Sequence, residues 1–386
     1  MATNNNDKTL NVPHLRFPEF NGEWEKKRIS EFCTLLKGTG ISKDQLSTNG
    51  NPCILYGELY TKYKAEIINE VLSCTELDAN TLVKSKVNDV IIPCSGETAI
   101  DIATARYVPF DDVLLGGDLN ILRSNKVNGS FLAYQLNGKR KYDIARVAQG
   151  VSVVHLYGEH LKNIVISLPV IEEQQKISRL LHLLDERIAT QNKIIEDLKK
   201  LKSAISLKML HSDSWKQFKI KDIASIGRGR VISSVEISQQ DNPLYPVYSS
   251  QTSNEGIMGY LDNFMFEGEY INWTTDGANA GTVFYRDGKF NCTNVCGLLK
   301  LGDEFDTYFV SLVLAEATKK YVSTNLANPK LMNNTMGSIQ IRLPKLKEQK
   351  RISIAFRKLR ELLEVHNSLL TEYSRLKQYL LSQMFI

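Results

Sequence analysis

The stretch that decides the fold is Ile166-Ser-Leu-Pro-Val-Ile-Glu-Glu-Gln-Gln-Lys-Ile-Ser178, which recurs as Ile341-Arg-Leu-Pro-Lys-Leu-Lys-Glu-Gln-Lys-Arg-Ile-Ser353. The two copies are 175 residues apart, and the match continues without a gap to Met209 and Met384. A long-period repeat indicates that one structural unit has been duplicated. The chain of 386 residues is therefore interpreted as two versions of one architecture.

A second, fainter repeat precedes each copy. Trp24-Glu-Lys-Lys-Arg-Ile-Ser-Glu-Phe32 resembles Trp215-Lys-Gln-Phe-Lys-Ile-Lys-Asp-Ile223 at an offset of 191, and the same offset aligns Gly38 with Gly229. Because this offset is larger than the first, the second globular unit is expected to be 16 residues shorter than the first.

Long helices are predicted after Pro169 and Pro344. Proline fits the first turn of a helix, and a long run without Gly or Pro follows each of the two. Apolar residues then recur at alternating three- and four-residue steps, the a/d seam of a coiled coil. The seams contain Ile177, Leu181, Leu184, Ile188, Gln191, Ile195, Leu198 and Ile205, and then Ile352, Phe356, Leu359, Leu363, His366, Leu370, Tyr373 and Leu380. Each helix would span about 40 residues, or ~60 Å.

We expect the two helices to pair with each other as an antiparallel coiled coil about a pseudo-twofold axis. This pairing would place Gln191 opposite His366, as a polar layer that fixes the register. The alternative is that each helix packs only on its own globular unit. The expected parts of the chain are globular units at 1–165 and 212–340 and helices at 166–211 and 341–386.

Each globular unit is expected to be α+β. Short apolar runs separated by Gly, Asp and Asn predict strands. Apolar segments at 131–136 and 308–317 predict a helix after the strands of each unit. The predicted strands include 89–93, 113–115, 119–122, 269–273, 282–285 and 297–301.

Composition is that of an ordinary globular protein, with 42% hydrophobic and 24% charged residues. The first residues contain no apolar signal core, and no run of about 18 uncharged apolar residues occurs, so we expect no export, no membrane contact and a cytoplasmic location. The six cysteines form no C-x-x-C pair, and we expect them to be buried small hydrophobes.

Sequence motifs for catalysis and metal binding are absent. The chain has no G-x-x-x-x-G-K-[ST] loop and no H-E-x-x-H pair, and Cys292 and Cys296 have no accompanying ligand set. Asn242-Pro-Leu-Tyr245 lacks the second proline of the Asn-Pro-Pro-Tyr loop of amino-methyltransferases. We therefore expect no catalytic residue, metal site or cofactor in this chain. Two other functions stay open for the chain. One is a self-contained DNA methyltransferase or nuclease, and the other is a structural coiled-coil scaffold.

The repeated Leu-Pro-x-x-x-Glu-Gln-x-[Lys/Arg]-Ile motif at 168–177 and 343–352, together with the opening at 12–24, resembles the specificity subunit of type I restriction-modification enzymes. Gly150-Val-Ser-Val-Val-His-Leu156 resembles the family's lead into the first helix, whereas the second unit has Pro329-Lys-Leu-Met-Asn-Asn-Thr-Met336 there. The resemblance implies two target recognition domains that each read one half of a split, asymmetric double-stranded DNA sequence, with the paired helices as a spacer.

The resemblance also implies partners. Two methylation subunits would dock on the helices and bring S-adenosylmethionine and the active sites. Restriction subunits would then supply ATP- and Mg-dependent translocation and cleavage. The chain itself would be non-catalytic, and the divergence between its two units predicts two different half-sites at a separation set by protein geometry.

Candidate DNA contacts are basic, amide and aromatic side chains in loops, because such groups read base edges and bind phosphates. The candidates are Lys37, Lys43 and Tyr56 in the first unit and Arg228, Arg230, Tyr248 and Gln251 in the second. Further candidates for phosphate contact, near the end of each unit's helix, are Lys139, Arg140, Lys141, Lys319 and Lys320. For each of them the other interpretation is a solvated charge or a core tyrosine.

The net charge of +5 is unevenly distributed. Residues 171–211 and 344–386 together carry +7, and the rest of the chain carries −2. We therefore expect DNA to be read by local basic loops on nearly neutral domains, with much of the phosphate binding left to partner subunits.

Overall fold

The computed structural model describes residues 10–150, 152–323 and 328–386. These residues form two compact units. Unit 1 contains the described residues up to Lys193 together with Asn367–Ile386, and unit 2 contains the described residues of Ile194–His366. Each unit includes part of both long helices, α7 (Ile171–Met209) and α12 (Leu346–Gln383).

Unit 1 combines small sheets with short helices. Its strands are β1 (Glu25–Arg28), β2 (Thr34–Lys37), β3 (Leu46–Ser47), β4 (Asn51–Ile54), β5 (Ser73–Thr75), β6 (Asp89–Pro93), β7 (Ser95–Gly96), β8 (Arg106–Val108), β9 (Leu114–Leu115), β10 (Leu119–Arg123), β11 (Val154–His155) and β12 (Val165–Leu168). Its short helices are α1 (Ile29–Phe32), η1 (Lys43–Gln45), α2 (Glu58–Thr61), α3 (Ala99–Ile102), α4 (Gly129–Asn137), α5 (Lys141–Val147) and α6 (Gly158–Lys162).

Unit 2 has the same kind of architecture. Its strands are β13 (Lys216–Lys219), β14 (Ala224–Arg228), β15 (Tyr245–Tyr248), β16 (Ile257–Leu261), β17 (Phe266–Glu267), β18 (Tyr270–Thr274), β19 (Val283–Arg286), β20 (Lys289–Cys292), β21 (Cys296–Leu301) and β22 (Gln340–Leu343). Its short helices are α8 (Ile220–Ile223), α9 (Ser234–Ser238), η2 (Ser253–Gly256), α10 (Thr307–Ala317), η3 (Thr318–Lys320) and α11 (Asn333–Ser338).

The main four-stranded sheet is equivalent in the two units. Strand order β2-β10-β6-β8 in unit 1 corresponds to β14-β21-β18-β19 in unit 2, and both sheets are antiparallel. A second sheet in each unit contains one parallel pair, β4 with β9 and β15 with β20. These topologies confirm the α+β prediction, and each strand run predicted from the sequence overlaps an observed strand.

The two sequence repeats meet in one strand pair in each unit. Glu25 pairs with Leu168 in the antiparallel ladder of β1 and β12, and Lys216 pairs with Leu343 in that of β13 and β22. Glu25 and Lys216 are 191 residues apart in sequence, and Leu168 and Leu343 are 175 residues apart. The two offsets therefore describe one duplicated fold, whose first and last strands are hydrogen-bonded to each other.

The glutamine of each repeated motif joins a long helix to its unit. The Gln174 side chain donates to the Pro169 carbonyl oxygen (2.8 Å) and accepts from the Asn128 backbone N–H (2.9 Å). Gln349 makes the same two bonds, to the Pro344 carbonyl (2.8 Å) and from the Asp306 backbone N–H (3.0 Å). The two glutamines are 3% and 1% exposed.

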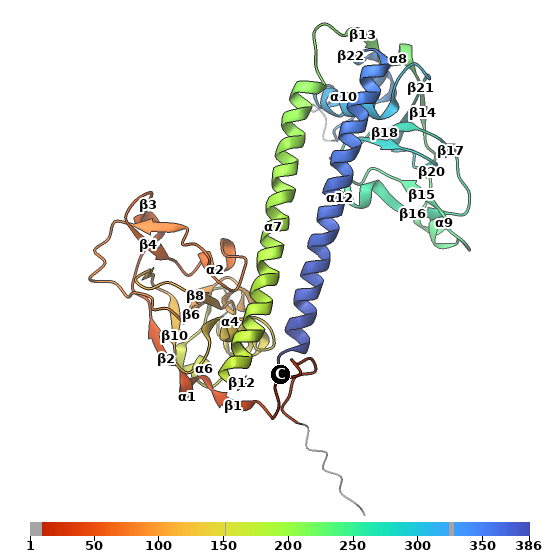
Figure 1. Cartoon of the computed structure of the whole chain (residues 1–386). Helices are drawn as coiled ribbons and strands as arrows, with labels where there is room; N and C mark the ends of the chain where they lie inside the picture. The colour runs from red at the N-terminus through yellow and green to blue at the C-terminus, as the bar shows by residue number, and fades with distance from the viewer. Residues whose placement is uncertain (1–9, 151, 324–327) are drawn as a thin grey trace, which may run out of the picture. The chain divides into compact units, whose positions relative to one another are not determined.

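The residue whose backbone N–H donates to each motif glutamine is also the N-cap of a helix, α4 in unit 1 and α10 in unit 2. The Asn128 side chain accepts from the Phe131 N–H at the start of α4 (2.9 Å), and the Asp306 side chain accepts from the Phe309 N–H at the start of α10 (2.7 Å). Each cap is also bonded to the serine that ends the repeated motif. Figure 1 shows α4 beside the first part of α7, and α10 beside the first part of α12. The motif thus connects two helix beginnings in each unit.

Each long helix begins two residues after its proline, so Pro169 and Pro344 lie just outside the first turn. Their carbonyls are used by the motif glutamines, and their fixed φ suits the chain direction before a helix.

The long helices pack against each other within each unit. In unit 1, Leu181 and Leu184 of α7 share an apolar cluster with Leu380 and Leu381 of α12. In unit 2, Ile352 and Phe356 of α12 pack in the cluster that contains Leu210, with Ile205 and Met209 against it. The beginning of one helix therefore meets the end of the other, as the antiparallel prediction requires. Gln191 and His366 belong to different units, and their pairing stays a prediction.

A lysine occupies one seam position of α12 in unit 1. Lys377 follows Tyr373 by four residues and precedes Leu380 by three, and its ammonium is paired with Glu66 (2.5 Å) and Asp185 (2.6 Å). Burial acts to lower the pKa of Lys377, but the two carboxylates outweigh it and raise that pKa. The effect holds the ammonium charged. The sequence pattern missed this network because Glu66 comes from a loop 311 residues away.

None of the described helices combines the length and apolarity needed to cross a bilayer. Of the six cysteines, five are buried as expected and Cys74 is half-buried.

The first expected outcome concerns Gln174→Leu. This change leaves the Asn128 N–H and the Pro169 carbonyl without their buried partner, and it should destabilise unit 1 by about 2–4 kcal/mol. Equilibrium denaturation followed by circular dichroism measures the loss. Gln175→Leu is the matched control, because Gln175 is exposed one position along the same helix. An equal loss in the two variants would contradict the role assigned to the motif.

The second expected outcome concerns Lys377→Met. Removing the ammonium leaves Glu66 and Asp185 buried without their ion-pair partner, and unit 1 should lose about 3–5 kcal/mol of stability. Arg375→Met is the control, because Arg375 and its partner Glu372 are exposed and such pairs contribute little. Thermal unfolding that is unchanged by Lys377→Met would show that the network does not stabilise the helix pair.

Candidate nucleic-acid interface

In unit 1, the loops at the ends of both four-stranded sheets meet. The Gly38 N–H donates to the Leu119 carbonyl (3.0 Å), the Gly116 N–H to the Ile54 carbonyl (2.9 Å), and the Cys94 N–H to Asp118 (2.6 Å). The loops brought together, which we call the strand-end edge of unit 1, are 37–43, 54–57, 94–97 and 115–118.

Close backbone approach explains why glycine is repeated at Gly38 and Gly229. A Cβ on Gly38 would lie 1.9 Å from the Gly116 carbonyl oxygen, and one on Gly229 would lie 2.1 Å from the Cys292 oxygen. Only glycine fits where two backbone segments approach this closely, and we call each such place a glycine crossing. The preceding residue in each unit, Lys37 or Arg228, is thereby placed at the rim of the edge.

The candidates of unit 1 lie along this edge in different environments. Lys37 ends β2 and is exposed, and Lys43 is exposed at the start of η1. Lys37 lies near Cys94: burial raises the pKa of that thiol to about 11, and the Lys37 ammonium acts against the rise. Tyr56 is half-buried against the core around Ile54. Two lysines and one aromatic side chain thus occur on one edge.

The sequence interpretation missed Tyr60, which belongs to the same surface. Burial raises the pKa of Tyr60, and Tyr56 adds to the rise. A Cβ on Gly96 would lie 3.6 Å from the Tyr60 hydroxyl, so this tyrosine borders the strand-end edge. It lies in the short helix α2, whose sequence carries no signal that separates a rim tyrosine from a core one.

Unit 2 has an equivalent edge. The Thr275 N–H donates to the Val295 carbonyl (2.9 Å), the Thr293 N–H to the Tyr248 carbonyl (2.9 Å), and the Gly229 N–H to Cys296 (3.3 Å). The strand-end edge of unit 2 consists of 228–232, 248–256, 274–281 and 292–296.

The segment before each long helix also closes on its edge in the same way. The Leu156 N–H donates to the Cys94 carbonyl (2.7 Å), and the Leu331 N–H donates to the Thr275 carbonyl (2.8 Å). The two segments, 150–156 and 329–336, differ in sequence. Their backbone pairing is nevertheless shared, as far as the described residues extend.

The two arginines of the unit 2 edge are held differently. Arg228 donates to the Thr275 hydroxyl (2.9 Å) and lies 3.6 Å from the Asp276 carboxylate. The Arg230 guanidinium is bidentate on Glu236, and this hydrogen bonding raises its pKa. Arg230 would have to leave a bidentate carboxylate to contact DNA, whereas Arg228 would leave one hydroxyl hydrogen bond and a longer ion pair with Asp276.

A buried arginine supports the aromatic candidate of unit 2. The Arg286 guanidinium lies 3.6 Å from the Tyr248 ring centroid and donates to the Glu255 carbonyl (2.6 Å). Arg286 is 4% exposed, and burial lowers its pKa. Burial also raises the pKa of Tyr248. The side-chain amide of Gln251 donates a hydrogen bond to the carbonyl of Ile257, the first residue of β16.

The remaining candidates occur elsewhere, at the ends of α4 and α10. Arg140 donates to the Ile386 carbonyl (3.0 Å) and pairs with Asp143 (3.2 Å), so its guanidinium is bound within unit 1. Lys139 is exposed, and burial lowers the pKa of the half-buried Lys141.

The lysines at the end of α10 are exposed. Lys319 pairs with Glu316 at 3.0 Å. Lys320 lines a hollow with His211 beside the end of α7. No bond joins these two lysines to the strand-end edge, among the interactions of the described residues. DNA contact by any single candidate stays a prediction.

Across 10–150, 152–323 and 328–386, no group of three or more His, Cys, Asp or Glu side chains is placed to hold a metal ion.

Comparison with known proteins gives a family match in both units. A family model described as the type I restriction modification DNA specificity domain matches residues 21–200 and again residues 212–373.

Several relatives from Mycoplasma pneumoniae match parts of the chain. One, described as the N-terminus of a putative type I specificity subunit, is 46% identical over 140 residues, which are 36% of this chain and 74% of the relative. Another putative type I specificity subunit is 35% identical over 206 residues, 52% of this chain and 85% of the relative. The specificity subunit of the type I restriction enzyme MpnII is 42% identical over 147 residues, 37% of this chain and 44% of the relative.

Two solved structures are similar in fold over almost the whole chain. The S subunit of a type I restriction-modification system from M. genitalium has a TM-score of 0.72 at 17% identity, covering 97% of this chain and 99% of that one. A chain from a structural study of complex assembly and conformational transition in the type I R-M system has a TM-score of 0.53 at 16% identity, covering 94% and 97%.

Proposed function

The chain belongs to the family of type I restriction-modification DNA specificity domains, and from this premise we propose that it reads a bipartite, asymmetric DNA target. Each unit would read one half-site through its strand-end edge. The spacer formed by α7 and α12 would fix the number of unspecified base pairs between the halves, because half-site separation follows protein geometry.

The observation that carries the proposal is that equivalent backbone positions at the two strand-end edges carry different side chains. The crossing glycines Gly38 and Gly229 have equivalent surroundings, but the residues before them are Lys37 and Arg228. The parallel strand pair of the second sheet ends in Ile54 in unit 1 and in Tyr248 in unit 2. A shared scaffold with different rim chemistry supports two different half-sites, since lysine, arginine and tyrosine make different contacts with bases and phosphates.

We further propose that this chain does no chemistry itself. Two methylation subunits would dock on the long helices and supply S-adenosylmethionine and the active sites. Restriction subunits would supply the ATP- and Mg-dependent steps, in the cytoplasm. The positive charge of the helix segments 171–211 and 344–386 supports a role near DNA in such a complex, because local basic charge attracts the phosphate backbone.

Exchange of one recognition unit tests this proposal. Residues 14–165 would be replaced by the corresponding unit of another specificity subunit, coexpressed with the methylation subunits, and methylated bases mapped across a genome. One half of the target should change while the other half and the gap stay the same. Replacement of 212–340 is the reciprocal control. A change in both halves from a single exchange would overturn the modular reading.

Single substitutions test the two edges separately. Lys37→Ala should weaken methylation through the first half-site, and Arg228→Ala through the second, each by about 1–3 kcal/mol if the side chain contacts a base. Competition between DNA duplexes altered in one half-site measures which half is affected. Lys289→Ala is the control in unit 2, because Lys289 is exposed on β20 beside Glu267. Equal effects of Lys289→Ala and Arg228→Ala would contradict the assignment of the edge.

A further inference from the structure

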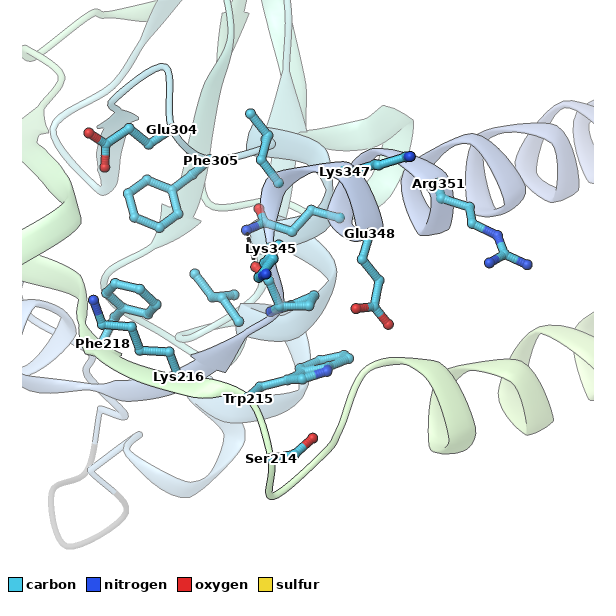
Figure 2. A pocket seen from close by; sticks show the side chains of 14 residues that line it. Ser214, Trp215, Lys216, Phe218, Glu304, Phe305, Lys345, Lys347, Glu348 and Arg351 are labelled. Atoms are coloured by element: carbon cyan, nitrogen blue, oxygen red, sulfur yellow. Dashed lines mark hydrogen bonds between the residues drawn. The ribbon is translucent and has the colours of Figure 1, made fainter.

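Unit 2 contains a pocket that the proposed DNA-reading role does not use. It lies at the first turn of α12, has a volume of about 840 Å³, and is lined by residues that include Trp215, Phe305, Lys345, Lys347, Glu348 and Arg351. Figure 2 shows the Glu348 carboxylate and the Trp215 indole facing the same open space. The volume lies within the roughly 300–1,000 Å³ range of ligand-binding pockets.

The equivalent place in unit 1 is filled by the chain's own N-terminal segment. Glu348 corresponds to Glu173 at the offset of 175, and the Arg16 guanidinium is bidentate on Glu173, with both N···O distances 2.8 Å. The side chains of Arg16 and Glu173 are 16% and 0% exposed. A buried bidentate pair of this kind is among the stronger interactions in proteins.

Two neighbours of Arg16 complete the contact in unit 1. The Lys176 ammonium lies 4.5 Å from the centroid of the Phe17 ring, and Lys176 also pairs with Glu19. In unit 2 the residue equivalent to Lys176 is Arg351. The site around Glu173 and Lys176, which we call the unit 1 socket, therefore binds an arginine, an aromatic residue and an acidic residue that lie within four positions of sequence.

The described chain supplies no such segment to unit 2. In unit 1 the backbone N–H of Trp24 donates to the Asn11 carbonyl (2.8 Å) of the N-terminal segment, whereas the backbone N–H of Trp215 donates to the Ser212 carbonyl (3.3 Å) within a tight turn. Trp24 is 2% exposed and Trp215 is half-buried. Glu348 is exposed, and no ion pair to it occurs among the described residues.

We propose that the unit 2 pocket is a docking site for an extended segment of a separate partner protein, in which an arginine is followed by an aromatic residue and is flanked by acidic residues. The arginine pairs with Glu348, and the aromatic and acidic residues meet Arg351, as their counterparts meet Lys176 in unit 1.

The rim of the pocket argues for a partner rather than a second copy of this chain. Lys216 and Lys347 stand where unit 1 has Glu25 and Glu172, so the rim of unit 2 is more basic. Residues 10–20 contain one arginine, one histidine and one acidic residue, which does not match such a rim. That segment is also tethered to its own socket at a high effective concentration, which opposes its transfer to another molecule.

Peptide binding to the full chain tests the site. The probe is a fluorescent peptide with the sequence of residues 10–20 carrying Asn11→Asp and His14→Asp, and anisotropy measures its binding. Saturable binding is expected, with affinity reduced at least tenfold by Arg16→Ala in the peptide. Glu348→Gln and Glu348→Lys in the chain should each reduce it at least tenfold. A peptide with Arg16→Glu should bind the Glu348→Lys chain better than it binds the unchanged chain.

Glu361→Lys is the matched control, because Glu361 is exposed on the same helix in unit 2 and lies outside the pocket lining. It should leave peptide binding unchanged. Absence of saturable binding, or equal binding to the Glu348→Gln chain, would overturn the site. Self-association of the chain that is lost on Glu348→Lys, seen by sedimentation, would overturn the partner assignment in favour of a second copy.

Discussion

The duplicated fold depends on a single side-chain amide in each half. Gln174 and Gln349 each bridge the carbonyl of a proline and the backbone N–H of a helix N-cap, and both are buried. A buried amide that satisfies one donor and one acceptor fixes both position and direction, since any shift leaves a polar group unpaired. Each long helix is thereby set at a defined angle on its own unit, before the seam begins.

This attachment matters for the proposed function, in which the strand-end edges would have to be held at a fixed place relative to the long helices. The glycine crossings at Gly38 and Gly229 set the same backbone framework in each unit, and the residues mounted on it differ. Arg286 beneath Tyr248 and the Glu236 pair of Arg230 show that the unit 2 edge is organised by its own contacts. The main four-stranded ladder and the parallel pair of the second sheet are thus shared, while the outer strands of the second sheet, the loops and the side chains diverge.

The sequence predicted the features that follow a period. The duplication and the seam of each long helix were found from spacing, the helix starts from Pro169 and Pro344, and the α+β class from short apolar runs separated by turn residues. It missed the features that depend on distant partners. Lys377 lies at a seam position where the pattern expects an apolar residue. Its ammonium is instead paired with both Glu66 and Asp185.

The candidate site was predicted less completely than the fold. Lys37, Tyr56, Arg228 and Tyr248 do lie on strand-end edges, because turns between strands place their residues there. Arg140 is bound to the end of the chain, a contact across 246 residues that no local pattern reveals. Arg286 ends a strand and carries no sequence signal that distinguishes a buried guanidinium from an exposed one.

Mapping methylated bases in cells that express the unaltered chain with its methylation subunits is the most direct measurement of whether the two units read DNA separately. A target of two different short sequences, separated by a gap of constant length, is the expected result. A single continuous motif, or two identical half-sites in palindromic order, would contradict the proposal that the two units are divergent readers separated by a helical spacer.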